Sequence, residues 1–183
     1  MPRLHAVEPE AADAKAQPAL ENLQKSLGKV PNLFRTVSAS PAALDGLLQL
    51  RSALARGHLR LAVREAIAIA LAEEHGCDYC LSTHVASAER VGLSTDSVSE
   101  IREGRSSDPK IDAAIAFALA VTRTRGNVSD ADLERVREAG YTDADIVEIV
   151  ANVTANVFTN YMNNVARTEI DSPVVRTRKS VHA

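Results

Sequence analysis

Regularly spaced helix boundaries are the feature of this sequence that most restricts its fold. Segments rich in Ala, Leu and Ile end at glycines and begin at capping residues such as Ser40 and Ser129, the residue types preferred at helix C-termini and N-termini. Pro41 follows Ser40 at the first helical position. Aromatic residues make up only 3% of the chain, and alternating β-branched segments of strand length are scarce. The sequence therefore predicts an all-α protein of about eight or nine helices joined by short turns.

The same boundaries divide the chain into expected elements. Five of the seven prolines fall in the first 41 residues, which predicts an N-terminal arm (residues 1–30) of short helices, one of them ending at Gly28. Thr142 and Asp145 have the spacing of a capping box at the start of the last helix. Further helices are expected over about 41–57, 59–75, 77–91, 109–126, 129–140 and 142–167, with a short one over about 94–104.

Bulk properties favour a soluble enzyme-sized domain. The 183 residues suit a single domain over 1–183, with a flexible, basic C-terminal tail over 172–183. The net charge of −3 gives no electrostatic basis for binding nucleic acid or anionic lipid. The N-terminus lacks an apolar signal region, and no segment approaches the roughly 18 apolar residues that span a bilayer. A cytoplasmic location is therefore expected.

The two cysteines of the chain, Cys77 and Cys80, form a C-x-x-C pair. In a reducing compartment this pair indicates redox or metal chemistry more often than a structural bridge. If a helix begins at Cys77, then Cys80 lies about 300° and His84 about 340° around it, so all three share one face, whereas Tyr79 points elsewhere. The N–H groups and partial positive charge of a helix N-terminus stabilise a thiolate.

Glu65 lies 12 residues before Cys77, on the preceding expected helix. An antiparallel hairpin turning at Gly76 would place its carboxylate near His84, where it could accept or donate a proton. Spacing alone is equally consistent with Glu65 being a surface residue.

Other readings of these residues stay open. Two thiols with His84 and His75 could ligate zinc, although His75 at a helix end also suits the helix dipole. The asparagines near the end of the chain form one polar stripe that either lines the thiol site or a subunit interface, or makes hydrogen bonds between helices. They are Asn152, Asn156, Asn160, Asn163 and Asn164.

Glu65, Cys77, Cys80 and His84 reproduce the pattern E-x11-C-x-x-C-x3-H. This pattern resembles the AhpD-like alkylhydroperoxidases, within the carboxymuconolactone decarboxylase-like superfamily, and particularly its "peroxidase-related" members. The segments 31–34, 75–80 and 156–164 are also similar, and the likeness covers about residues 30–172.

The resemblance implies an all-α fold that assembles as a trimer or hexamer and reduces peroxides. It implies that Cys80 is the peroxidatic thiol, that Cys77 resolves it by closing a disulfide, and that Glu65 and His84 relay protons. In the best-studied members the residue before the second cysteine is histidine, and here it is Tyr79. A tyrosine with an ordinary pKa of about 10 is no base near neutrality, so Tyr79 is expected only as an accessory that orients a group by hydrogen bonding.

Together these observations predict a thiol-dependent hydroperoxidase or dithiol–disulfide oxidoreductase. It would use a hydroperoxide substrate, an external dithiol reductant and no metal or organic cofactor. The alternatives are a decarboxylase or lactone-processing enzyme of the wider superfamily, and a non-enzymatic oligomer switched by its disulfide. The peroxidase hypothesis requires two adjacent sulfurs that an oxidant can reach.

Overall fold

In a computed structural model, residues 1–179 are described and form nine α-helices and two 3₁₀ turns, with no strand among them. This confirms the all-α expectation. In chain order the elements are η1 Pro9–Ala11, α1 Gln17–Leu27, α2 Asn32–Val37, α3 Pro41–Ala55, α4 Leu61–Glu74, α5 Asp78–Ala88, η2 Glu89–Val91, α6 Thr95–Arg102, α7 Pro109–Thr124, α8 Asp130–Glu138 and α9 Asp143–Ala166.

Local capping chemistry sets most of these boundaries where the sequence predicts them. Thr142 and Asp145 form the expected capping box, in which each side chain bonds the backbone N–H of the other, and so do Ser129 and Asp132. The helix expected over 77–91 is shorter than predicted. It ends as an α-helix at Ala88 and continues as the 3₁₀ turn η2, which tightens the last turn before Gly92.

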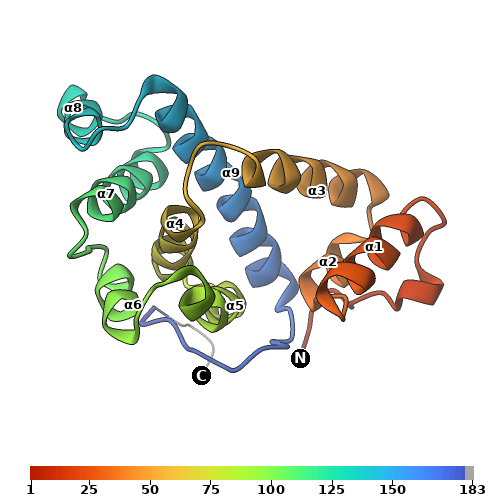
Figure 1. The fold of residues 1–183 in the computed structure, drawn as a ribbon. Coiled ribbons are helices and arrows are strands. Elements are labelled where there is room, and N and C mark those ends of the chain that lie inside the picture. The colour runs from red at the N-terminus through yellow and green to blue at the C-terminus, as the bar shows by residue number, and fades with distance from the viewer. Residues whose placement is uncertain (180–183) are drawn as a thin grey trace.

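The centre of the molecule is α4, which contacts α5, α6, α7 and α9. Figure 1 shows α9 running diagonally beside α4, between α7 and α3, with α1 and α2 beyond α3. All residues of α4 from Ala66 to Glu73 are buried, because neighbouring helices cover every side of it. Each fully buried Leu or Ile in this core, such as Ile69, contributes on the order of 2 kcal/mol.

A sharp turn at Gly76 joins α4 to α5 and makes the two helices neighbours. Gly76 has φ +63°, in the left-handed region that favours glycine. The N–H of the next residue, Cys77, bonds back to the Ala72 carbonyl at 2.9 Å. A Cβ at Gly76 would also lie 3.4 Å from the Lys179 carbonyl oxygen, so the turn meets the C-terminal segment.

That C-terminal segment crosses the start of α5 and reaches α6 (Figure 1). The sequence predicts a flexible tail over 172–183. Instead, residues 175–179, here called the strap, are held to α4, α5 and α6 by hydrogen bonds and ion pairs. Residues 180–183 of the expected tail lie outside the described residues.

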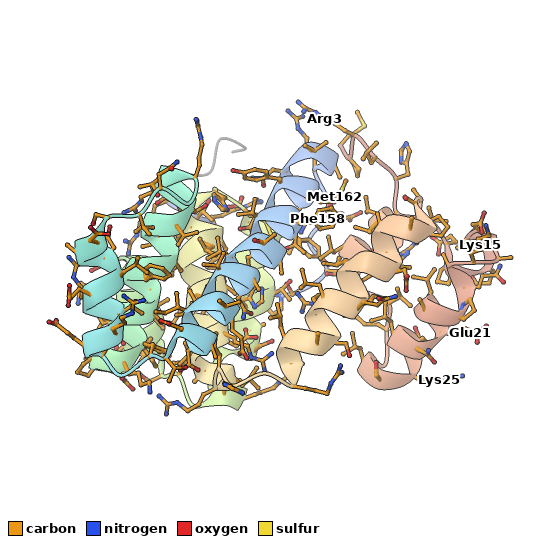
Figure 2. All side chains as sticks on the ribbon, turned by 90° about the horizontal axis from the view of Figure 1, so that it is seen from above. Arg3, Lys15, Glu21, Lys25, Phe158 and Met162 are labelled. Atoms are coloured by element: carbon orange, nitrogen blue, oxygen red, sulfur yellow. A yellow bond between two sulfur atoms is a disulfide. The ribbon has the colours of Figure 1, made fainter. Side chains whose placement is uncertain are left out.

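The N-terminal arm is also anchored, because it contacts the C-terminal end of α9. The backbone N–H of Arg3 donates to the Ala166 carbonyl at 2.7 Å, and Figure 2 shows Arg3 beside the C-terminal end of α9. Although α9 is the longest helix, neither it nor any other helix in residues 1–179 has the length and hydropathy needed to cross a bilayer.

Candidate active site

Cys77 and Cys80 form a disulfide at the N-terminus of α5. Cys77 is the N-cap, and its sulfur accepts a hydrogen bond from the Cys80 backbone N–H at 3.2 Å. Their Cα atoms lie 5.4 Å apart, within the range that a disulfide spans. The C-x-x-C spacing therefore closes a ring around the first turn of the helix.

Both sulfurs are less accessible than the sequence analysis expected. Cys77 is 0% exposed and Cys80 is 4% exposed, so the expectation that an oxidant can reach them is not met in this conformation. Local sequence patterns do not predict this burial, because it depends on how distant segments such as α9 pack against the start of α5.

The strap attaches to the residue between the cysteines. The Asp78 carboxylate accepts hydrogen bonds from Thr177 (N at 2.8 Å, Oγ1 at 2.9 Å) and pairs with Arg176 at 2.8 Å. One turn further along α5, the buried Ser82 hydroxyl both donates to and accepts from the Val175 backbone. These contacts hold the strap against the first two turns of α5, the first of which carries the disulfide.

The structure brings Glu65 and His84 together, as the hairpin argument predicts. His84 Nδ1 lies 2.7 Å from Glu65 Oε2, and the two side chains are 15% and 17% exposed, respectively. An ionised carboxylate only accepts hydrogen bonds, so Nδ1 carries the proton and Nε2 is left to exchange one. Glu65 thus joins the site rather than the open surface.

Burial alone would raise the pKa of Glu65, but the His84 hydrogen bond and the positive charges of His84, Arg51 and Arg64 outweigh it. The net effect lowers the pKa below its ordinary value of 4.5. Glu65 is therefore ionised at neutral pH and can hold His84 in one orientation.

Two contacts thus lie along α5, one between the sulfurs and one between Glu65 and His84. Among residues 1–179, no hydrogen bond directly joins His84 to either sulfur. A proton passing between the two contacts would need a water or the substrate itself.

Tyr79 serves the packing of α5 rather than the sulfurs. Its hydroxyl accepts a hydrogen bond from the Leu33 backbone N–H at 3.2 Å, within the first turn of α2. Burial first, and then the nearby Asp171 carboxylate, raise the pKa of Tyr79 well above 10. The phenol therefore stays protonated at physiological pH, and its hydroxyl contacts the backbone of α2; an accessory role for Tyr79 in the chemistry stays a prediction.

The asparagine stripe on α9 divides into two parts. Asn152 and Asn156 donate to carbonyls of their own helix, one turn back. Near the other end, Asn163 Nδ2 lies 3.2 Å from Cys80 Sγ. The stripe thus contributes one direct contact to the thiol site, which polar spacing alone could not distinguish from interhelical bonding.

His75 lies where α4 ends and is held by α9 and α7. Its Nδ1 lies 2.8 Å from Asn160 Oδ1 and its Nε2 lies 3.0 Å from Thr122 Oγ1, while Asn164 Nδ2 donates to its carbonyl. Both ring nitrogens are therefore engaged with side-chain oxygens. In residues 1–179, no group of three or more His, Cys, Asp or Glu side chains is arranged to hold a metal ion.

A pocket of about 730 Å³ adjoins the disulfide turn. Its walls include Gly76, Asp78 and Tyr79 from the turn, Asn163 from α9 and Arg176 from the strap. Neither cysteine is among the residues that line it, but Asn163, which contacts Cys80, is one of them.

Known proteins share this architecture. The sequence model of the carboxymuconolactone decarboxylase family matches residues 41–124. No curated protein sequence matches the chain significantly. The crystal structure of a peroxidase-related protein with an AhpD core from Ralstonia eutropha is similar, with a TM-score of 0.83 and 26% identity over 93% of this chain and 92% of that one.

Two further crystal structures share the fold. A peroxidase-related protein from Silicibacter sp. has a TM-score of 0.77 and 23% identity, covering 91% of this chain and 92% of its own. A variant of the debrominase Bmp8 in complex with 2,3,4-tribromopyrrole also has a TM-score of 0.77, with 22% identity, covering 92% of this chain and 91% of its own.

The helical architecture is that of the structure with an AhpD core. This similarity and the family match over α3 to α7 support placing the chain in the superfamily of AhpD-like and carboxymuconolactone decarboxylase-like proteins.

Proposed function

We propose that this protein is a thiol-dependent hydroperoxidase that cycles between a dithiol and the Cys77–Cys80 disulfide. The observation that carries the proposal is the disulfide at the start of α5, one turn before a histidine held by an ionised glutamate. Two thiols supply the two electrons that a hydroperoxide takes up, and the acid–base pair supplies the proton movement.

In the proposed cycle the Cys80 thiolate attacks the distal peroxide oxygen and breaks the O–O bond. Cys80 becomes a sulfenic acid, and the departing alkoxide takes a proton and leaves as an alcohol. The Cys77 sulfur then attacks Cys80, the S–S bond forms, and the hydroxyl leaves as water. An external dithiol reduces the disulfide by exchange, and His84 with Glu65 carries protons during these steps.

The burial of both sulfurs gives the strap a place in this cycle. A peroxide or a dithiol must contact a sulfur directly, so we propose that the strap moves away from Asp78 and Ser82 during turnover. A disulfide that must be reset by an external dithiol suits a reducing compartment, which supports a cytoplasmic location.

Self-association is part of the proposal. From residue 149 to residue 166, α9 carries no charged side chain. Several large apolar residues on it are nonetheless exposed, namely Val150, Phe158, Tyr161 and Val165, and Figure 2 shows Phe158 on the part of α9 near α3. We propose that a second copy of the chain covers this face in a homo-oligomer, a trimer or hexamer being the family expectation.

Replacing each cysteine tests the proposed roles. Cys80→Ser should abolish consumption of a hydroperoxide in the presence of a dithiol. Cys77→Ser should still react once and accumulate a sulfenic acid, detected by dimedone labelling and mass spectrometry. Full peroxide consumption by Cys80→Ser would refute the assignment of Cys80.

The double replacement distinguishes the alternatives. A decarboxylase or lactone-processing activity needs no thiol exchange and should survive loss of both cysteines. A redox-switched oligomer would form and open its disulfide without turnover on any of several peroxides and dithiols.

A further inference from the structure

Asn163 provides the Cys80 sulfur with a hydrogen-bond donor from a distant part of the chain. Its Nδ2 lies 3.2 Å from Cys80 Sγ, and 83 residues separate the two in sequence. Asn163 is only 3% exposed and Cys80 only 4%. Little water can therefore compete for this contact, and an electrostatic interaction is stronger there than at the surface.

The two sulfurs have different donors. The Cys77 sulfur accepts from the Cys80 backbone N–H, which belongs to the first turn of α5 itself. The Cys80 sulfur accepts from a side chain of α9. A substitution at Asn163 should therefore change the environment of one sulfur and leave the backbone donor of the other in place.

The remaining polar atom of the Asn163 amide argues against a purely structural role. Its Oδ1 is buried and has no hydrogen-bond partner among the described residues. A buried carbonyl oxygen without a partner destabilises the folded state, so this half of the amide does not account for an asparagine here. The amide can also rotate, so that Oδ1 accepts from a Cys80 thiol and Nδ2 donates to a thiolate.

The neighbouring asparagines fix the position of α9 against the disulfide turn. Asn160 and Asn164, on either side of Asn163, bond the ring and the carbonyl of His75, two residues before Cys77. The Asn163 amide is thereby presented to Cys80, and within residues 1–179 no second hydrogen bond holds it.

We propose that Asn163 is a further catalytic residue, whose amide N–H stabilises the thiolate of Cys80 and makes Cys80, rather than Cys77, the sulfur that attacks. The catalytic meaning of this contact rests on the proposed peroxidase function. The contact itself acts on the reduced protein, where a hydrogen bond to a charged sulfur is about twice as strong as one to a neutral atom.

The test measures the alkylation rate of Cys80 by iodoacetamide against pH, in reduced protein carrying Cys77→Ser so that a single thiol reacts. Adding Asn163→Leu removes the donor and keeps a side chain of the same branching. We expect it to raise the pKa of Cys80 by about one unit, which means roughly tenfold slower alkylation below that pKa. The unfolding midpoint should be unchanged or higher, because the unpaired Oδ1 is removed as well.

Asn156→Leu is the matched control. Asn156 is another buried asparagine of α9, but its Nδ2 bonds the Asn152 carbonyl and does not touch a sulfur. It should leave the alkylation profile of Cys80 unchanged. In the Cys80→Ser background, Asn163→Leu should leave the alkylation profile of Cys77 unchanged as well.

An unshifted Cys80 profile in folded Asn163→Leu protein would overturn the inference, as would an equal shift in Cys77. If the larger leucine prevents folding, Asn163→Ala gives the same readout with the donor removed and no added volume. Because alkylation requires no turnover, a shifted Cys80 in a protein that consumes no peroxide would refute the proposed function and leave the role of Asn163 standing.

Discussion

The first and second turns of α5 carry the two halves of the candidate site, and they are built in different ways. The second turn presents His84 to Glu65 on the adjacent helix, only 19 residues away, and both side chains remain partly exposed. The first turn holds the disulfide, which is buried, and it is contacted by residues far along the chain, at Cys80 by Asn163 and at Asp78 by the strap.

The two halves of the site therefore depend on different physical properties, one on charge and the other on burial. The Glu65–His84 pair depends on ionised groups within one helical hairpin, and water can still reach it. The sulfurs depend on a neutral amide from α9 and on a strap that attaches to Asp78. In the proposed function, the Glu65–His84 half should therefore respond to changes of charge, and the sulfur half to changes of packing and access.

Among the variants that test this comparison, removal of the His84 imidazole should have the largest effect on activity. His84→Ala should lower kcat/KM for a hydroperoxide by about 10²-fold, because general acid–base catalysis typically contributes at least that much. The disulfide should still form. Steady-state peroxide consumption is the measurement, with His58→Ala, at an exposed histidine, as the control.

The dependence of activity on pH provides a second test of the Glu65–His84 pair. Because the pKa of Glu65 lies below 4.5, its carboxylate stays ionised as pH falls from neutrality and is lost only below that value. Glu65 therefore causes no change of activity between pH 5 and pH 8.

Activity of His84→Ala within twofold of the unchanged protein would place the proton relay elsewhere.

Tyr79→Phe should affect stability more than chemistry. Removing the hydroxyl leaves the buried Leu33 N–H without its acceptor, at a cost of about 1–3 kcal/mol in the free energy of unfolding, measured with urea. Turnover at pH 7 should stay within about twofold, since the phenol remains protonated there.

Tyr161→Phe is the control for Tyr79, because Tyr161 is exposed and keeps its ring contact with His75 as phenylalanine. A large loss of turnover in Tyr79→Phe with unchanged stability would instead place Tyr79 in the proton relay.

Loosening the strap should have the smallest effect, and its sign should be a gain. Arg176→Ala combined with Thr177→Val removes two side-chain contacts to Asp78, and the Thr177 backbone N–H can still donate to it. Reduction of the disulfide by a small dithiol should become about threefold to tenfold faster, as expected for one or two partly exposed hydrogen bonds.

The strap experiment has its own control in Arg135→Ala with Thr154→Val. This variant removes the same side-chain groups at exposed positions far from α5 in sequence. If both double variants are reduced at the rate of the unchanged protein, the strap does not limit access to the sulfurs.

Sequence patterns predicted the fold well because they are local. Capping boxes such as Thr142 with Asp145 act within one turn, and the Gly76 turn determines that α4 and α5 become neighbours. The approach of Glu65 to His84 follows from that hairpin and from helical periodicity. The contact between Asn163 and Cys80 could not be predicted in this way, since it depends on how α9 packs against α5.

The sequence alone determined the helices, the disulfide-forming spacing of Cys77 and Cys80, and the helical face that carries His84, because these depend on interactions within one or two turns. Only the tertiary structure decided that the sulfurs are buried, that Asn163 is the donor to Cys80, and that the C-terminal segment is a strap rather than a free tail. Those contacts join residues 83 to 99 positions apart, and the packing of whole helices sets such distances.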